Sequence, residues 1–167
     1  STTAMLAMGD ALAVVVAERK RFKGRDFALL HPGGQLGRKL LLRVADLMRT
    51  AGANPIVRET ARVKEVLVAV TKARAGCASV VNSRGKLMGI FTDGDLRRHL
   101  DSTPNLTAQR VCDVMTRKPK TINANCLAAE ALGVLREHKI DELVVVDGGR
   151  RPVGLLDIQD LLKAGFV

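Results

Sequence analysis

Two short segments place hydroxyl and carboxylate side chains at the start of a helix, where they could bind an anion. Residues 89–96 read Gly-Ile-Phe-Thr-Asp-Gly-Asp-Leu, and 65 positions later residues 154–161 read Gly-Leu-Leu-Asp-Ile-Gln-Asp-Leu. In each segment a glycine and two apolar residues predict a short buried strand, which turns through polar residues into a helix. Because the first N–H groups of a helix are unpaired, each segment predicts an anion site.

A third candidate for chemistry is His31, which lies in the sequence His31-Pro32-Gly33-Gly34. Pro32 disfavours a helical conformation for His31, and the two glycines allow a close approach of the backbone to a ligand. A neutral imidazole can carry a proton near pH 7. The alternative is a histidine that only hydrogen-bonds its loop. The glycines and the nearby Arg38-Lys39 favour an active-site loop.

The cysteines and the other histidines argue against a metal site. Cys77, Cys112 and Cys126 are odd in number and show no C-x-x-C spacing, which indicates reduced thiols in a cytoplasmic protein rather than disulfides or zinc. His99 and His138 are expected on helices without a second metal-ligating residue at a useful spacing. We therefore predict no metal.

The composition bounds the partners. With 167 residues, 47% of them hydrophobic, the chain can bury one ordinary core or two small ones. No signal peptide is visible, nor an apolar run of the roughly 20 residues that a membrane span needs, so no membrane partner is expected. The net charge of +10 favours phosphates and other anions. With no Trp, no Tyr and four Phe, the chain lacks stacking platforms for nucleic acid, which we do not expect as a partner.

The elements around the two opening segments repeat at the same spacing. A predicted helix at 63–67 matches 128–132 and a predicted strand at 78–82 matches 143–147, both at this spacing, and before them the Asp-x-Met residues 46–48 match 113–115. Each repeat reads β-α-β-β-α, an α/β (α+β) unit too small to bury its sheet alone. We therefore expect the two units to pack against each other, joined by a linker at 101–110.

The first 20 residues predict a helix that is apolar on nearly every side. Thr3 is a suitable N-cap, and Arg19, Lys20 and Arg21 suit the negative end of the helix dipole. Such a helix needs other elements around it, and residues 1–40 contain none that could enclose it. Its partners are expected in a missing upstream domain or in another subunit.

The repeated motifs resemble a tandem pair of CBS (cystathionine-β-synthase) domains. The resemblance rests on Asp-x-Met, on Val-Val followed by Asn82 or Asp147, and on the Gly-to-Asp-Leu endings of the two opening segments. It covers roughly residues 41–167, and it implies CBS domains at 41–104 and 105–167.

Further motifs are similar to the C-terminal part of the D-arabinose-5-phosphate isomerase family. They are Met8-Gly9-Asp10-Ala11, the His31-Pro32-Gly33-Gly34 loop and Gly37-Arg38-Lys39. The resemblance implies that residues 1–40 are the last helix and loop of a sugar isomerase (SIS) domain and that His31 acts in catalysis. The parent enzyme would interconvert D-ribulose 5-phosphate and D-arabinose 5-phosphate for Kdo and lipopolysaccharide synthesis, by acid–base chemistry without an obligatory cofactor. The present segment alone would be inactive.

The resemblance also implies a nucleotide cleft in the CBS pair. Thr92 would contact phosphate and Asp95 the ribose hydroxyls, with Ile56, Val57 and Asp160 also in the cleft. Lys86, Arg97 and Arg98 could add phosphate contacts. In the second copy Asp157 replaces the threonine, and a carboxylate repels phosphate, which argues against an adenylate site there. The alternative for Thr92 and Asp95 is that they only cap the helix, because both types are preferred at helix starts.

Two functions stay open from the sequence. The CBS pair could regulate the isomerase by binding AMP, ATP or a CMP-linked sugar, within a tetramer that contains dimers of CBS pairs. Alternatively, it could be a stand-alone ligand-binding or oligomerisation module with no catalytic role. A DNA-binding regulator is a weaker hypothesis, because the sequence offers no helix-turn-helix candidate.

Overall fold

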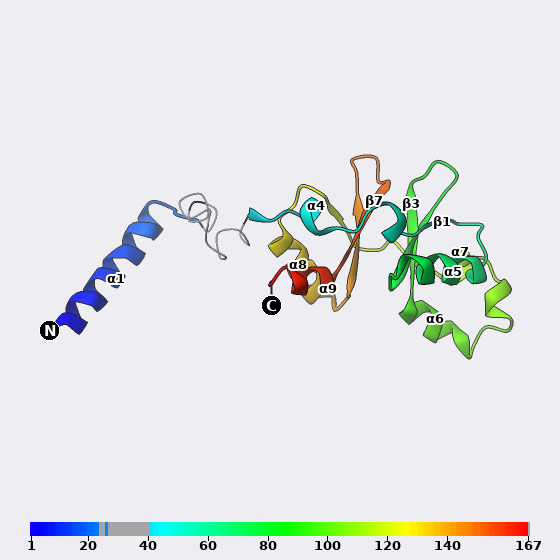
Figure 1. The fold of residues 1–167 in the computed structure, drawn as a ribbon, viewed down its shortest axis with the longest axis horizontal. Helices are drawn as coiled ribbons and strands as arrows, with labels where there is room; N and C mark the ends of the chain where they lie inside the picture. Colours follow the sequence, from blue (N-terminus) through cyan, green and yellow to red (C-terminus); the bar gives the residue numbers. More distant parts are fainter. Residues whose placement is uncertain (24–25, 27–40, 167) are drawn as a thin grey trace. The chain divides into compact units, whose positions relative to one another are not determined.

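The computed structural model describes residues 1–23, 26 and 41–166, and it divides into two compact units, Ser1–Leu42 and Arg43–Val167. In the first unit, helix α1 spans Thr2–Arg19 (Figure 1). Ser1 is the N-cap residue, so Thr3 lies inside the helix and its predicted capping role is wrong. In the part of the chain that the structure describes, no residue of α1 is buried. His31 and its glycine loop lie outside the described residues.

The second unit contains the two predicted β-α-β-β-α repeats, and both are confirmed. The first consists of β1 (Ile56–Arg58), α5 (Val63–Ala73), β2 (Cys77–Val81), β3 (Leu87–Thr92) and α6 (Asp93–Leu100). The second consists of β5 (Thr121–Asn123), α8 (Ala128–His138), β6 (Glu142–Val146), β7 (Pro152–Asp157) and α9 (Ile158–Lys163). In both, the first strand runs parallel to the second, which pairs antiparallel with the third.

Short helices precede the repeats, and they are exchanged between them. Helix α4 (Val44–Leu47) precedes the first repeat but packs on the second, where Val44 N donates to Cys126 O at 2.9 Å. Helix α7 (Val111–Val114) precedes the second repeat but packs on the first, where Val111 N donates to Ala61 O at 2.8 Å. Figure 1 shows α4 beside α8 and β7, and α7 beside α5. The two repeats are therefore interlocked.

The same exchange extends each sheet. Strand β4 (Thr116–Arg117), which follows α7, pairs antiparallel with β3 and completes the sheet order β1-β2-β3-β4. In the other sheet, β5-β6-β7, the residue Arg49 takes the matching place and exchanges two backbone hydrogen bonds with Leu155, of 2.7 and 3.0 Å.

Glycines in β3 and β7 admit a methionine from each exchanged segment. A Cβ atom added to Gly89 would clash with Met115 Sδ and would lie 2.8 Å from Thr116 O, while one added to Gly154 would lie 2.5 Å from Met48 Sδ. In each sheet, therefore, the methionine of an Asp-x-Met motif packs against the glycine that begins one of the two opening segments.

The core has two parts. One lies within the first repeat, where Val63, Val66 and Val70 share one face of α5 and pack with Phe91 of β3. The other joins the two sheets and contains Cys77, Leu87 and Ile90 of the first repeat with Val144 and Leu155 of the second. This confirms the prediction that the two repeats bury their sheets against each other.

The cysteines carry free thiols, and the described helices and metal-ligating residues form neither a membrane span nor a metal cluster. All three cysteines are free. No described helix is long and apolar enough to cross a membrane. Within residues 1–23, 26 and 41–166, no three His, Cys, Asp or Glu side chains gather in a way that could hold a metal ion.

Candidate functional site

The start of α6 is built by a reciprocal cap between Thr92 and Asp95. Thr92 Oγ1 accepts from Asp95 N at 3.2 Å, and Asp95 Oδ2 accepts from Thr92 N and from Thr92 Oγ1, both at 2.9 Å. This capping box is the pattern that a Thr followed three residues later by an acid predicts. The capping alternative is thus what the structure shows, and nucleotide contact by these two residues stays a prediction.

Asp95 is 2% exposed, and its other oxygen is also occupied. Oδ1 accepts from Thr116 Oγ1 at 2.7 Å and from Arg98 NH2 at 2.5 Å. Thr116 belongs to β4, the segment exchanged from the second repeat. A buried carboxylate needs hydrogen-bond donors to offset its loss of hydration. Asp95 therefore holds the side chains of Thr116 and Arg98 at the N-terminal end of α6.

A pocket of about 630 Å³ lies in front of this helix start. It is bounded by the start of α6, by the loop after β4 and by the turn between α8 and β6. Two of the predicted phosphate contacts, Arg97 and Arg98, line it together with Thr92. The remaining lining residues are Ile90, Asp93, Gly94, Thr116, Lys118, Pro119, Lys120, His138, Lys139, Ile140, Asp141 and Glu142. We call this cavity the α6 pocket.

The α6 pocket contains three cations that sequence reasoning missed, namely Lys118, Lys120 and Lys139. All three belong to the second repeat, whereas Thr92 belongs to the first, and the sequence carries no signal that brings them together. The closest hint is positional, because Lys118 and Lys120 follow the second Asp-x-Met motif. An anion bound at α6 would therefore contact both repeats.

Three other predicted cleft residues lie elsewhere. Val57 packs on the core of the first repeat, Ile56 is 46% exposed, and neither lines the α6 pocket. Lys86 also lies outside it, in the turn between β2 and β3, where its backbone N donates to Asn82 Oδ1. The exchange explains why: the residues that lead into β5, rather than those of β1, border this pocket.

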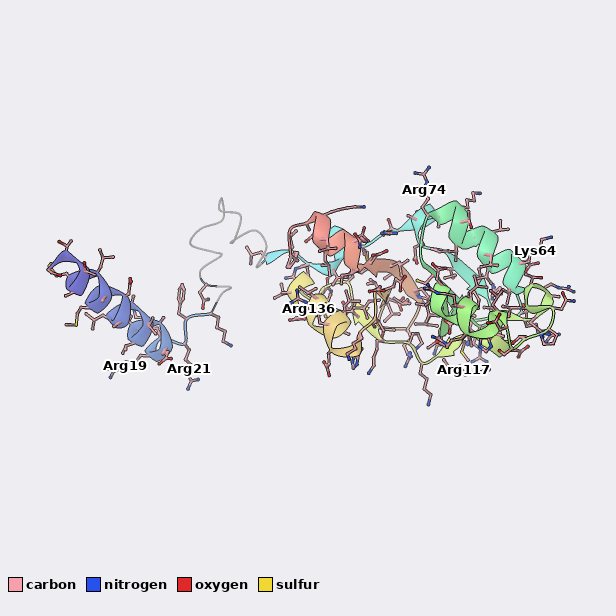
Figure 2. All side chains as sticks on the ribbon, turned by 90° about the horizontal axis from the view of Figure 1, so that it is seen from below. Arg19, Arg21, Lys64, Arg74, Arg117 and Arg136 are labelled. Atoms are coloured by element: carbon pink, nitrogen blue, oxygen red, sulfur yellow. The ribbon has the colours of Figure 1, made fainter. Side chains whose placement is uncertain are left out.

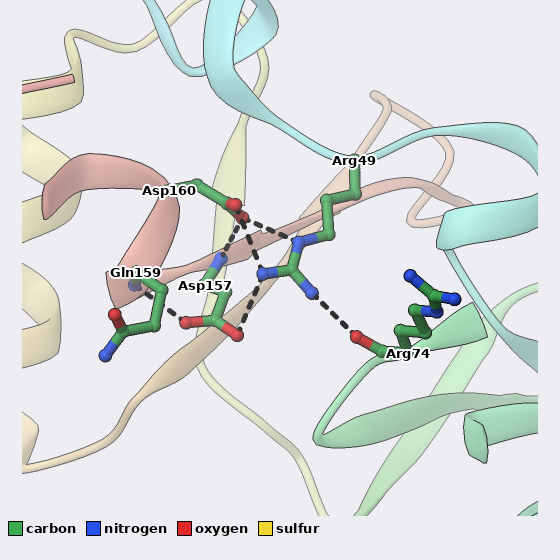
Figure 3. A network of polar contacts seen from close by, with 5 residues as sticks. All are labelled: Arg49, Arg74, Asp157, Gln159 and Asp160. Atoms are coloured by element: carbon green, nitrogen blue, oxygen red, sulfur yellow. Dashed lines mark hydrogen bonds and ion pairs between the residues drawn. The ribbon is translucent and has the colours of Figure 1, made fainter. Parts of the chain in front are cut away.

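In the second repeat the corresponding carboxylates are paired with Arg49 (Figure 3). Arg49 Nε donates to Asp160 Oδ2 at 2.8 Å, and Arg49 NH2 donates to Asp160 Oδ1 and to Asp157 Oδ2, both at 3.1 Å. The hydrogen bond to Asp160 raises the pKa of the guanidinium above its ordinary value, although burial opposes it. Asp157 also caps α9, where its Oδ1 accepts from Gln159 N at 2.8 Å.

Arg49 also reaches back to the first repeat. Its NH1 donates to the carbonyl oxygen of Arg74 at 3.2 Å, at the C-terminal end of α5 (Figure 3). That carbonyl belongs to a helix end whose groups lack intrahelical partners. The Arg49 guanidinium therefore links the start of α9 to the end of α5. Arg49 corresponds in the second sheet to Thr116 in the first, since Arg49 pairs with Leu155 of β7 and Thr116 pairs with Ile90 of β3.

The α6 pocket is also lined by three carboxyl groups. They belong to Asp93, Asp141 and Glu142. Burial, together with the charges of Asp157, Asp141 and Asp93, raises the pKa of Glu142 to about 7. Burial also raises the pKa of the Cys77 thiol, with Glu142 as the next cause. The pocket thus combines fixed positive charges with a carboxyl group that titrates near neutrality.

Comparison with known proteins identifies the repeats. The model of the CBS domain matches residues 44–102 and 111–166. Over all 167 residues the chain is 47% identical to arabinose 5-phosphate isomerase KdsD of Pseudomonas aeruginosa and 44% identical to that of Escherichia coli K12. It covers 51% of each, so the chain spans about half the length of the curated relatives that it matches. The resemblance to the arabinose-5-phosphate isomerase family is thus confirmed at the level of sequence.

Similar solved structures confirm the fold. The CBS domain protein PAE2072 from Pyrobaculum aerophilum, complexed with AMP, has a TM-score of 0.65 and 22% identity, over 75% of this chain and 100% of that one. The CBS domain pair of protein MJ0100, in complex with 5-methylthioadenosine and S-adenosyl-L-methionine, has a TM-score of 0.67 and 21% identity, over 74% and 94%. At these identities the likeness establishes a CBS-pair fold.

We expect Arg49→Ala to destabilise the second unit by roughly 1–3 kcal/mol, because it leaves Asp157 and Asp160 half-buried without their cation. Arg58→Ala is the matched control, since the exposed side chain of Arg58 makes a single hydrogen bond among the described residues, to Asn82 O at 3.0 Å, and should cost less than about 0.5 kcal/mol. Urea denaturation of the two variants measures the difference. Equal losses would contradict a structural role for the Arg49 network.

Proposed function

Because the chain belongs to the CBS domain family, we propose that it is a ligand-sensing module and that the α6 pocket is its binding site. The observation that carries this proposal is the meeting of a capped helix start, from the first repeat, with three lysines from the second. A ligand that contacts both would stabilise the interlocked pair, and so its presence could be transmitted to an attached domain.

The proposed ligand is a nucleotide or a nucleotide-linked sugar. The N–H groups at the start of α6 and the nearby lysines suit a phosphate, and a cavity of about 630 Å³ has room for a nucleotide. PAE2072, a protein of the same fold, was solved with AMP. We therefore retain AMP, ATP and a CMP-linked sugar as candidates.

We further propose one site per chain. In the second repeat Arg49 pairs with the carboxylates that would face a ligand, and Asp157 stands in the place of Thr92. A phosphate there would have to displace Arg49 and then face two carboxylates. Asp160 is accordingly assigned to this network rather than to nucleotide binding.

We expect isothermal titration calorimetry to detect one bound nucleotide per chain. Lys120→Ala and Lys139→Ala should each weaken binding by roughly 3–10-fold, more at low than at high salt, because each removes a cation from the pocket. Lys64→Ala is the control, since Lys64 extends to solvent from α5 (Figure 2) and does not line the pocket, and it should change nothing.

A chain that binds none of AMP, ATP and a CMP-linked sugar would favour the second candidate, an assembly module. The feature that favours this candidate is α1, whose Met5, Leu6 and Leu12 side chains are at least 60% exposed. Assembly as dimers of CBS pairs within a tetramer is part of the proposal for the parent protein under either candidate.

For the parent protein we propose the activity of its relatives, the interconversion of D-ribulose 5-phosphate and D-arabinose 5-phosphate in the cytoplasm, for Kdo and lipopolysaccharide synthesis. The support is the identity of 47% over the whole chain to a protein of that name. The remaining catalytic groups would lie in an SIS domain that ends within residues 1–40, with His31 as the catalytic residue of this segment. The segment alone is then inactive, and no cofactor is required.

In the full-length protein, we expect His31→Ala to lower kcat by at least about 100-fold, the usual contribution of a general acid or base. His99→Gln is the control, because His99 lies on α6 and its side chain hydrogen-bonds only Thr103 among the described residues. An isomerase assay on purified protein distinguishes them. Undiminished activity of His31→Ala would refute the catalytic role.

A further inference from the structure

We propose that Glu142 couples ligand binding in the α6 pocket to proton uptake, so that an anionic ligand binds more tightly at pH 6.5 than at pH 8.5. This inference rests on the proposed function, because it concerns the regulation of that same pocket. In this proposal the protonation state of Glu142 sets the affinity of the pocket for an anionic ligand.

The geometry places the Glu142 carboxyl between the two repeats. Glu142 is the first residue of β6 and lines the α6 pocket. Its Oε1 atom lies against Gly76 of the first repeat, where an added Cβ would clash with it. Among the described residues, no side-chain hydrogen bond or ion pair engages this carboxyl. It is half-buried and lines the cavity, and none of the described cations forms an ion pair with it.

The charged groups around Glu142 come from every neighbouring element. Asp141 precedes it in the same turn, Asp93 begins α6, and Asp157 ends β7, opposite Glu142 in the sheet register. Arg49 is the cation that acts on Glu142, but it is committed to Asp157 and Asp160. The other titratable or charged groups of the pocket and of β2 are Arg97, Arg98, Lys118, Lys120, His138, Lys139 and Cys77.

The electrostatic consequence is that the ionised form is disfavoured. Burial is the largest cause, followed by Asp157, Asp141 and Asp93, and together they raise the pKa of Glu142 to about 7. A bound phosphate adds further negative charge, which raises the pKa again. The protonated carboxyl is neutral and can donate its O–H to a ligand oxygen, whereas the carboxylate repels that oxygen.

The sign of the linkage follows directly. Below about pH 7 the carboxyl is already protonated, so the affinity is at its plateau. Above that pH the free pocket has lost the proton that the complex retains, so the affinity falls until the bound carboxyl ionises as well. If the ligand raises the pKa by roughly one unit, the total fall is about tenfold.

The fold itself does not demand a glutamate here. The two repeats match at a spacing of 65, and the residue of the first repeat that corresponds to Glu142 is Cys77, which is buried and free. A glutamate at this position therefore lowers the stability of the fold when it is ionised. Residues with perturbed pKa values that do not stabilise the fold often lie in binding sites.

Calorimetry with AMP at about pH 6.5 and about pH 8.5, at constant ionic strength, tests the inference. The wild type should bind about sixfold more weakly at the higher pH, and Glu142→Gln should change less than about twofold. The AMP phosphate gains negative charge over the same interval, an effect of opposite sign, so the ligand cannot produce the fall. Repetition in buffers of different ionisation enthalpy should show proton uptake by the wild type and none by Glu142→Gln.

His138→Gln is the matched control, because it replaces another polar side chain that lines the same pocket. It should keep the wild-type pH profile. Parallel profiles for wild type and Glu142→Gln, or a flat profile for His138→Gln alone, would overturn the inference while leaving the proposed function intact. If the wild type binds no probe at either pH, the proposed function fails, and this inference fails with it.

A ligand-free measurement separates these outcomes further. Since a glutamate in an unfolded chain titrates near pH 4.3, a folded-state pKa of about 7 makes ionised Glu142 destabilising above pH 7, and that cost disappears below the unfolded value. Glu142→Gln should therefore raise Tm at about pH 8 by roughly 2–4 °C, after allowance for solvent screening, and by less at about pH 5. An unchanged Tm at both pH values would also contradict the inference.

Discussion

The structure depends on one carboxylate at the third position of α6 and one at the third position of α9. Each accepts a hydrogen bond from a segment exchanged between the repeats. Asp95 is almost completely buried; it caps α6 through one oxygen, and Thr116 and Arg98 donate to the other. Asp160 caps α9 in the same way, with Arg49 as the donor. Thr116 and Arg49 both come from segments exchanged between the repeats. Helix capping, sheet extension and the interlocking of the two repeats are therefore one arrangement.

The two repeats satisfy this requirement with side chains of different size, and this makes their clefts unequal. Thr116 is short and leaves a cavity in front of α6, which lysines of the second repeat surround. Arg49 is long, pairs with both carboxylates at α9 and also binds the end of α5. The first arrangement can accept an anionic ligand, whereas the second already holds its own counter-ion. If the proposed function holds, the duplicated fold provides one binding site and one structural tie.

The sequence predicted the repeats because the strand, the glycine and the capping box are local features that recur at a fixed spacing. The same local pattern placed Thr92, Asp95, Asp157 and Asp160 at the starts of the two helices. The replacement of threonine by Asp157 also predicted that the second cleft is the less favourable one for a nucleotide. The exchange was not predicted, since the match between 46–48 and 113–115 shows equivalence but not which repeat each segment contacts. Lys118, Lys120, Lys139 and Glu142 look like ordinary surface residues in the sequence. Their role depends on burial and on neighbours distant along the chain.

The most direct test of this account is to rebuild the second cleft in the first, with the double variant Thr92→Asp and Thr116→Arg. The exchange adds one acid and one base, so the net charge is unchanged, and Asp at the N-cap is tolerated because Asp157 already occupies that position at α9. The measurement is the affinity for AMP, compared by calorimetry with that of the wild type. The account predicts a folded protein whose binding is at least about tenfold weaker, because a guanidinium fills the cavity and a carboxylate faces the phosphate. Wild-type affinity in the folded double variant would contradict it.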